Sequence, residues 1–231
     1  MLLETRNLNA FYGDFQALFG IDFQLEAGEI VAIIGANGAG KSTFLKTITG
    51  LLRAPGEAVR FEGRPIGGVP TGRIVAQGVA MVPEGRRLFA SLSVEENLRM
   101  GAYSGRTGRW NMESVYGLFP MLREKRDAPC TLLSGGQQQM VAIGRALMSN
   151  PKLLLCDETS LGLAPIVVKG IYEALAKITG EGLSAIIVEQ DVGLAQRASS
   201  RLYCFQEGRV SLTGRSREVT REQISHAYFG V

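Results

Sequence analysis

The segment GANGAGKS, from Gly35 to Ser42, constrains the fold of this chain more than any other stretch. It matches the pattern G-x-x-x-x-G-K-S, follows the apolar run EIVAIIG and precedes Lys41 to Thr49, whose apolar spacing predicts a helix. A strand, a glycine-rich loop and a helix in this order can cradle phosphate, because the glycines let successive backbone N–H groups turn inward around an anion. We therefore expect a nucleotide-binding loop here.

The positions of this loop have separate expected tasks. The residues expected to bind nucleotide are Gly35, Ala36, Asn37, Gly38, Ala39, Gly40, Lys41, Ser42 and Thr43. Lys41 would reach the β and γ oxygens, and the Ser42 hydroxyl would hold Mg²⁺. An ordinary glycine-rich turn before a helix is the alternative, which the strand, loop and helix context disfavours.

The apolar segment KLLLCDE ends in two adjacent carboxylates, Asp157 and Glu158. One carboxylate is enough for the metal shell, and we assign it to Asp157. The second suggests a general base for attack on the γ-phosphate, and hence hydrolysis by Glu158. Without the glycine-rich loop, a solvated acidic pair would be the better interpretation. Together the two motifs predict an NTPase that needs no covalent nucleophile.

Apolar runs alternate with helical patterns through most of the chain and indicate an open α/β sheet. EIVAIIG, GVAMVPEG, KLLLCDE and SAIIVEQ are continuously apolar, as in parallel strands buried on both faces, whereas LLETRNLNAFYG and AVRFEGRPI alternate. Further helices are expected over 164–179 and 192–198. From about residue 85 to 150 the patterns are helical only, with a capping box from Ser93 to Glu96. The chain then returns to strands and ends in a hairpin and a short helix.

The hairpin LYCFQEGRVSLTG is expected to turn at Glu207 and Gly208, and the final helix to begin at Thr220, capped with Gln223.

Composition excludes several classes of function. The net charge of +3 comes from 25 basic and 22 acidic residues dispersed along the chain, which does not indicate nucleic-acid binding. The three cysteines are far apart and include no C-x-x-C pair, as in a reducing cytoplasm. The one histidine, His226, rules out a central Ser-His-Asp triad and disfavours a zinc site. No window approaches about 18 consecutive apolar residues, so we expect contact with a membrane only through a partner.

The base of the nucleotide is suggested by two observations. A GTPase would be expected to carry an N-K-x-D sequence, which is absent here. Tyr12, expected in a loop between the first two strands, could stack its ring on adenine. A half-buried core tyrosine is the alternative interpretation of this residue.

The segment LLSGGQQQM places two glycines after Ser134, at the start of a predicted helix. The first N–H groups of a helix lack partners and carry the positive end of its dipole, so this is a second possible anion site. A plain N-cap is the alternative, since serine caps helices well.

GANGAGKS, LSGGQ and LLLCDE, in this order and spacing, resemble the nucleotide-binding subunit of ATP-binding cassette (ABC) proteins over essentially the whole chain. The resemblance implies one ABC ATPase domain over residues 1–231, in which a P-loop core has a mainly parallel sheet and an antiparallel β subdomain. The core would comprise 1–84 and 151–231, and an inserted helical lobe about 85–150. The implied ligands are ATP and Mg²⁺.

The family also implies a role for the second motif. It would cap the γ-phosphate of ATP held on a second cassette, in a head-to-tail dimer. The residues implied in that contact are Ser134, Gly135, Gly136 and Gln137.

Longer stretches, including MVPEGRRLFASLSVEENL and IIVEQD, resemble the smaller ATPase subunit of bacterial branched-chain amino-acid importers. This implies an energy-coupling ATPase, peripheral on the cytoplasmic face of the inner (plasma) membrane. Its partners would be a second, different cassette, transmembrane permease subunits and, indirectly, a substrate-binding protein, with no nucleic acid. Importers of urea or short amides and a soluble non-transport ABC ATPase stay open as alternatives, while a P-loop kinase would leave LSGGQ unexplained.

Three positions depart from the family pattern. Glu84 stands where most cassettes have glutamine, in a loop that senses Mg²⁺ and the membrane subunit, and a carboxylate remains a good metal ligand. Gln190 stands where the family has a histidine on the γ-phosphate; an amide can donate a hydrogen bond but cannot take up a proton, so we expect slower hydrolysis. Thr159 replaces a proline beside the segment 160–164 that crosses the dimer seam, which loosens that backbone.

Overall fold

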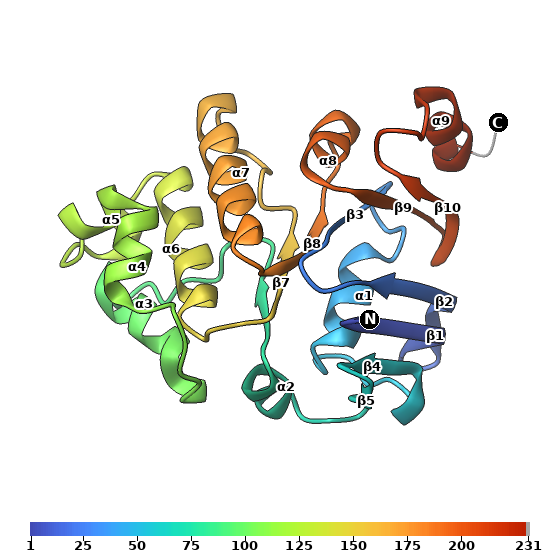
Figure 1. The fold of residues 1–231 in the computed structure, drawn as a ribbon, viewed down its shortest axis with the longest axis horizontal. Coiled ribbons are helices and arrows are strands. Elements are labelled where there is room, and N and C mark those ends of the chain that lie inside the picture. Colours follow the sequence, from blue (N-terminus) through green and yellow to red (C-terminus); the bar gives the residue numbers. More distant parts are fainter. Residues whose placement is uncertain (230–231) are drawn as a thin grey trace.

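The computed structural model describes residues 1–229, which form two β-sheets with helices packed against the larger one (Figure 1). The last residues of the expected domain, Gly230 and Val231, lie outside the described residues. The last described helix, α9 (Arg221–Phe229), packs beside strands β9 (Arg201–Gln206) and β10 (Arg209–Arg215) (Figure 1).

Within residues 1–229 the larger sheet has six strands in the order β10-β9-β3-β8-β7-β6. Its strands are β3 (Ile30–Gly35), β6 (Val79–Val82), β7 (Leu153–Asp157), β8 (Ser184–Val188), β9 (Arg201–Gln206) and β10 (Arg209–Arg215). All neighbours are parallel except β9 and β10, which form the expected hairpin at Glu207 and Gly208. Every residue of β7 and β8 is buried, which explains their continuously apolar sequences. The mainly parallel sheet is confirmed.

The smaller sheet has four strands among the described residues, in the order β2-β1-β4-β5. Its strands are β1 (Leu3–Tyr12), β2 (Phe15–Leu25), β4 (Val59–Phe61) and β5 (Arg64–Pro65). Strands β1 and β2, β1 and β4, and β4 and β5 pair antiparallel, which confirms the antiparallel subdomain. Tyr12 is the last residue of β1, so its expected place in a loop is wrong, because pairing with Phe15 continues to that residue.

Neither β2 nor helix α2 (Thr71–Gln77) was predicted. Register shifts between β1 and β2 interrupt the alternation that marks a strand. Helix α2 is short, begins after Pro70 and ends at Gly78 in the left-handed region, so it offers little apolar periodicity.

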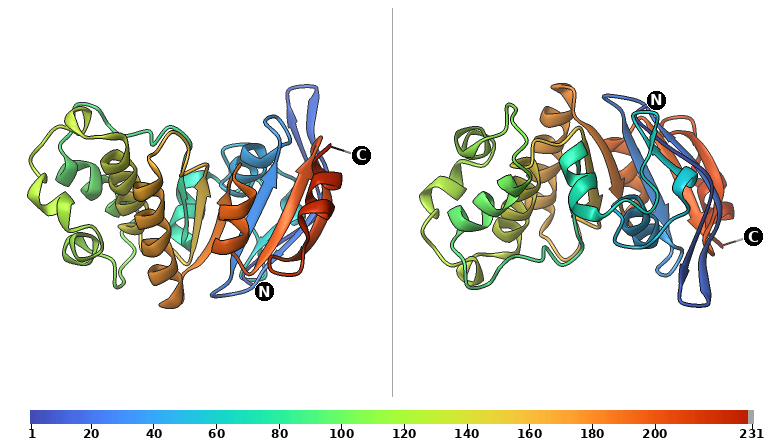
Figure 2. Two further views of the ribbon diagram at one scale, coloured as in Figure 1. Left: turned by 90° about the horizontal axis from the view of Figure 1, so that it is seen from above. Right: turned by 90° about the horizontal axis from the view of Figure 1, so that it is seen from below.

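The remaining helices are α1 (Lys41–Ile48), α3 (Val94–Gly101), α4 (Met112–Leu118), α5 (Pro120–Glu124), α6 (Gly135–Leu147), α7 (Pro165–Gly180), α8 (Val192–Ala198) and α9 (Arg221–Phe229), with 3₁₀ turns at Gly56–Ala58, Ala102–Ser104 and Cys130–Leu132. Of these helices, α1 packs against one face of the larger sheet and α7 and α8 against the other (Figures 1 and 2). The helices expected over 164–179 and 192–198 are confirmed to within one residue at each end. Within residues 1–229 none of them is long and apolar enough to cross a membrane.

Helices α3 to α6 gather at one end of the molecule (Figure 1). The capping box of α3 is confirmed, since Ser93 Oγ accepts from Glu96 N at 3.2 Å and Glu96 Oε2 accepts from Ser93 N at 2.8 Å. The cap of α9 is confirmed by the matching bonds between Thr220 and Gln223. The division of the chain near residues 85 and 150 stays a prediction.

Two apolar clusters occupy the two faces of the larger sheet. One joins the sheet to α7, α8 and the helices α3 to α6, and the other joins it to α1 and the antiparallel strands. In the second cluster the ring of Phe44 lies 5.0 Å from that of Phe23 and 5.4 Å from that of Phe205, centroid to centroid. Phe44 therefore fixes α1, and with it the loop that precedes α1, against both sheets.

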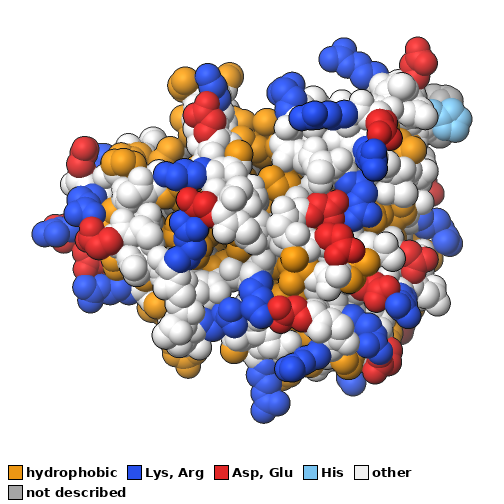
Figure 3. Space-filling view, viewed as in Figure 1, with side chains coloured by type: hydrophobic (Ala, Val, Ile, Leu, Met, Phe, Trp, Pro, Cys, Tyr) orange, Lys and Arg blue, Asp and Glu red, His pale blue; other side chains and the backbone are white. Residues whose placement is uncertain are grey.

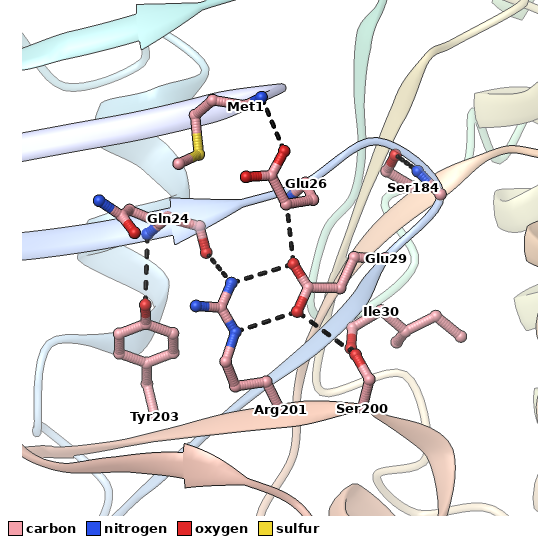
Figure 4. A network of polar contacts seen from close by, with 10 residues as sticks. Met1, Gln24, Glu26, Glu29, Ile30, Ser184, Ser200, Arg201 and Tyr203 are labelled. Atoms are coloured by element: carbon pink, nitrogen blue, oxygen red, sulfur yellow. Dashed lines mark hydrogen bonds and ion pairs between the residues drawn. The ribbon is translucent and has the colours of Figure 1, made fainter.

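A polar network ties the antiparallel strands to the start of β3 and β9 (Figure 4). Arg201 Nε and Nη2 each donate to a different oxygen of Glu29 at 3.0 Å, and Nη2 also donates to Gln24 O at 2.7 Å. Tyr203 Oη accepts from Gln24 N at 3.3 Å. This forked contact stiffens the end of the sheet opposite the glycine-rich loop.

Candidate functional site

The loop between β3 and α1 needs glycine because its backbone lies against other strands. Gly35 has φ of 150°, and a Cβ there would stand 2.3 Å from Phe205 O. Gly40 has φ of 101°, and a Cβ there would stand 2.8 Å from Leu18 Cδ2. Only glycine combines these dihedrals with such close approach. The turn between β9 and β10 also holds this loop, since Gly208 N donates to Ala39 O at 3.0 Å.

Lys41 runs beneath this loop and is buried. Its Nζ donates to Gly35 O at 2.8 Å and to Ala36 O at 3.0 Å, and it lies 3.6 Å from Glu158 Oε1. The cation is thus anchored by loop carbonyls on one side and faces the carboxylate after β7 on the other.

Ser42 and Asp157 meet although they lie on α1 and β7, far apart in the sequence. Ser42 Oγ donates to Asp157 Oδ1 at 3.0 Å, and Asp157 is 2% exposed. Burial raises the pKa of Asp157 to about 6; the hydrogen bond from Ser42 opposes that rise, and the charges of Glu158 and Glu84 add to it.

This donor set fits a hard cation. A hydroxyl and carboxylate oxygens are the ligands that Mg²⁺ prefers, and Mg²⁺ usually takes only one or two carboxylates together with substrate phosphates and water. The described residues hold no preformed group of three or more His, Cys, Asp or Glu side chains suited to a metal. Ser42, Asp157 and Glu84 therefore suit a magnesium ion that arrives with a nucleotide.

Glu158 and Gln190 form the second part of the site. Glu158 follows β7 with φ of 48°, and its backbone N donates to Val188 O at 3.0 Å. Gln190 Nε2 donates to Glu158 Oε2 at 2.6 Å and to Asn37 Oδ1 at 3.2 Å. The amide at position 190 thus bridges the glycine-rich loop and the candidate base.

These residues surround one cavity of about 420 Å³. It is lined by Asn37, Gly38, Gly40, Lys41, Ser42, Thr43, Glu84, Glu158, Leu161 and Gln190. The structure therefore brings the loop, Glu84, the candidate base and Gln190 together, with Asp157 directly behind Ser42.

Tyr12 lies beside this cavity. Its hydroxyl is 3.4 Å from Thr43 Oγ1, and the residue is 44% exposed, so its ring is at the surface and not in the core. An exposed aromatic ring beside the cavity is suited to stacking on a flat base.

The second glycine motif starts α6, and its residues 134–137 do not line this cavity. Ser134 Oγ accepts from Gln137 N at 3.4 Å, and Gln137 Oε1 accepts from Ser134 N at 2.9 Å. Arg86, from the loop after Glu84, donates from Nη1 to Gln138 Oε1 at 3.1 Å. A Cβ on Gly135 would lie 3.0 Å from Arg86 Nη2.

Arg86 and Glu189 were not predicted as site residues. Arg86 is part of the segment EGRR, whose only signal is its place after Glu84. Glu189 is an acidic residue that directly follows the buried strand β8 and is itself 1% exposed. An acid at the end of an apolar run is the signal that could have singled it out.

Comparison with known proteins decides the family. The family model described as ABC transporter matches residues 18–160, which is more than half of the chain. The chain belongs to the ABC transporter family. As a member it binds ATP and hydrolyses it to power transport, which confirms the expected ATPase activity.

Curated relatives match this cassette over nearly its full length. The high-affinity branched-chain amino acid transport ATP-binding protein BraG of Pseudomonas aeruginosa is 42% identical, over 99% of this chain and 100% of its own. A probable branched-chain amino acid transport ATP-binding protein, LivF of Archaeoglobus fulgidus, is 32% identical, over 96% and 95%.

Solved structures agree with the fold. A nucleotide-free ATP-binding cassette from an ABC transporter superposes with a TM-score of 0.82 at 29% identity, over 98% of this chain and 94% of that one. A dimeric bacterial ABC transporter cassette gives a TM-score of 0.82 at 25% identity, over 94% and 100%. The expected ABC ATPase fold is therefore confirmed.

Proposed function

We propose that this cassette is the energy-coupling ATPase of an importer for branched-chain amino acids. The observation that supports the activity is that Lys41, Glu158 and Gln190 line the same cavity, next to the loop that follows β3. The similarity to BraG over the full length of both chains supports the substrate class. Urea or short amides remain the alternative cargo, because cargo would contact the membrane subunits and a separate binding protein and not this chain.

Each site residue has a proposed role in the reaction. The loop from Gly35 to Thr43 binds the phosphates, and Lys41 supplies the cation for the β and γ oxygens. Ser42, Asp157 and Glu84 would hold Mg²⁺, and a bound Mg²⁺ would supply positive charge to the phosphates. Tyr12 stacks on the adenine.

Hydrolysis is assigned to the carboxylate after β7. Glu158 accepts the proton of the attacking water as general base, since it is the carboxylate that lines the cavity next to Lys41. Gln190 donates to Glu158 and orients it, and its amide can also reach a phosphate oxygen. Because an amide carries no charge, this site is expected to turn over more slowly than one with a cation at position 190.

The second motif serves a second cassette. Residues 134–137 start α6 and do not line this chain's own cavity. The N–H groups of Ser134 and Gln137 are bonded within the capping box, so the N–H groups of Gly135 and Gly136 are the ones proposed to bind a nucleotide brought by another chain. Exposed apolar side chains at Leu132, Leu161 and Ile166 support a head-to-tail contact with that chain. We take the second cassette to be a different chain, as the resemblance implies.

A groove beside the helical end is proposed to receive the permease. It has a volume of about 640 Å³ and exposes Phe89, Met100 and Tyr103. The loop that supplies Glu84 also runs past this groove through Arg87, so movement of the permease can reach the nucleotide site. We propose that the docked cassette lies on the cytoplasmic face of the inner (plasma) membrane, as the resemblance implies.

A nucleic-acid ATPase is less well supported. On the face shown in Figure 3, Lys and Arg side chains are interspersed with Asp and Glu side chains. Such a mixture gives no single-sign surface for a phosphate backbone.

Purification of the native complex tests this proposal. We expect the cassette to remain with membranes through protein contacts, and the complex to include a binding protein that retains leucine, isoleucine or valine. Retention of urea or a short amide would correct the cargo. Recovery of the cassette without any membrane subunit would remove the transport role.

A further inference from the structure

A buried carboxylate, Glu189, lies behind the catalytic cavity. It sits between the end of β8 and Gln190, and it is 1% exposed. Ser160 Oγ donates to its Oε2 at 2.5 Å, Thr159 Oγ1 donates to its Oε1 at 3.4 Å, and the Tyr172 hydroxyl donates to Oε1 as well. These donors come from two other segments, the one that follows β7 and helix α7.

Burial of this carboxylate is energetically unfavourable. All of its hydroxyl donors are neutral, and burial raises the pKa of Glu189 while the bonds from Ser160 and Tyr172 oppose that rise. A carboxylate taken out of water costs several kcal/mol before its hydrogen bonds are counted. An apolar side chain at the end of β8 would avoid the cost of burying a charge, but it would leave the hydroxyls of Thr159, Ser160 and Tyr172 without this acceptor.

The position of Glu189 suggests what it does. Its own backbone N donates to Ile33 O at 3.1 Å, which fixes it to β3 just before the nucleotide loop. The next residue, Gln190, donates to Glu158. Its donor Ser160 lies directly before Leu161, which lines the cavity. One carboxylate thus connects three segments that must be aligned at the γ-phosphate.

We propose that Glu189 is a positioning residue for ATP hydrolysis, which holds the Ser160 segment and Gln190 in register with Glu158. The inference rests on the proposed function. Thr159 belongs to the same hydrogen-bond network, because its hydroxyl donates to Glu189, whereas a proline at this position would have no donor. The hydrogen bond of the Thr159 side chain therefore restrains the backbone at position 159, where the ring of a proline would otherwise do so.

Loss of this carboxylate should slow chemistry and spare binding. Lys41 and the loop carbonyls that anchor it do not contact Glu189, so ATP should bind as before. Misplacement of Gln190 and Glu158 by a fraction of an ångström to about 1 Å is enough to lower turnover by up to about 100-fold. The expected signature is a lower kcat with little change in KM.

The test measures ATP hydrolysis by the assembled complex with variants of the full chain. We expect Glu189→Ala to lower kcat by about 10-fold or more with KM for ATP changed less than about twofold, and Glu189→Gln to restore part of the loss. Tyr172→Phe should lower kcat by about threefold. The matched control is Tyr116→Phe, which removes a hydroxyl donor to Glu95 in the helical region and should leave kcat unchanged.

A double-mutant cycle separates positioning from general loosening of the fold. Tyr172→Phe and Gln190→Ala should be non-additive in the presence of Glu189, by at least about threefold in kcat, and additive in Glu189→Gln. This comparison remains decisive if Glu189→Ala does not fold, because the other variants keep the volume of the core.

The opposite results would remove the inference. Unchanged kcat in Tyr172→Phe and Glu189→Gln, or additive effects in the cycle, would mean that Glu189 only fills space. These results can be distinguished from failure of the proposed function. That failure would appear as a cassette recovered without membrane subunits, or as a binding protein that retains no branched-chain amino acid.

Discussion

Asp157→Asn should make the protein more stable while it abolishes activity. The Asp157 carboxylate is buried, and its pKa is raised from an ordinary 3.8 to about 6. At about 1.36 kcal/mol per pKa unit, the ionised form destabilises the folded state by roughly 3 kcal/mol at pH 7. Asparagine has nearly the same shape and keeps an oxygen that accepts from Ser42 Oγ, so it removes the charge without removing the bond.

The pH dependence of the difference follows from the direction of the shift. Because the folded pKa lies above the unfolded one, the native state binds more protons between about pH 4 and pH 6, and the free energy of unfolding falls as pH rises through that window. Below it the carboxyl is neutral in both states and the penalty disappears. The advantage of Asp157→Asn should therefore shrink from about 3 kcal/mol at pH 7 to about 1.5 at pH 5.

Urea unfolding of both proteins at pH 5, 6 and 7, without divalent cations, measures this difference. Asp127→Asn is the matched control, because that carboxylate is exposed and its removal should change the free energy of unfolding by less than about 0.5 kcal/mol. Mg²⁺ with ATP should stabilise wild type and not Asp157→Asn. A variant that is less stable than wild type at pH 7, or a difference that does not depend on pH, would show that burial of this charge is not costly.

Three further changes probe the cavity. Lys41→Ala should abolish ATP binding or nearly so, measured with a fluorescent nucleotide, because it removes the cation on the β and γ oxygens; affinity within a few-fold of wild type would place the cradle elsewhere. Glu158→Gln should keep ATP affinity and lower turnover by on the order of 100-fold or more, and normal hydrolysis would move the base to another residue. Gln190→His should raise hydrolysis at this site in the assembled complex, because imidazole can carry a proton; an equal or lower rate would mean that the surroundings, including Asn37, are adapted to the amide.

The nucleotide loop could be predicted because it is continuous in sequence. The run from β3 through Lys41 contains the strand, the glycines and the helix start, so local pattern is enough. The antiparallel sheet was harder to predict, because register shifts between β1 and β2 hide the alternation of β2. Pairing with Phe15 also extends β1 to Tyr12, which was expected in a loop. The strands that are buried on both faces could be predicted, because burial of every residue makes their sequences continuously apolar, as in β7.

The connections within the site could not be predicted from spacing. Glu158 meets Gln190 only because β7 and β8 are neighbours, and Ser42 meets Asp157 although β3 and β7 are separated by β8. The order of strands in a sheet is set by how the whole chain packs, so the pattern of a single segment does not predict it. Arg86 and Glu189 were not predicted as site residues, because their hydrogen-bond partners lie on other segments of the chain.

The central claim is that the two phosphate-binding motifs of this cassette serve two different nucleotides. Nucleotide trapping in a complex of two different cassettes tests it, with photolabelled ATP to show which chain holds the trapped molecule. Gly135→Asp places a carboxylate and added volume next to Arg86 at the start of α6, outside the lining of this chain's own cavity. We expect it to end trapping on the partner's loop while the isolated variant binds ATP as wild type does, and Lys41→Ala to lose the label on this chain. If Gly135→Asp instead weakens ATP binding by the isolated cassette, the motif acts on its own chain's nucleotide and the head-to-tail arrangement is wrong.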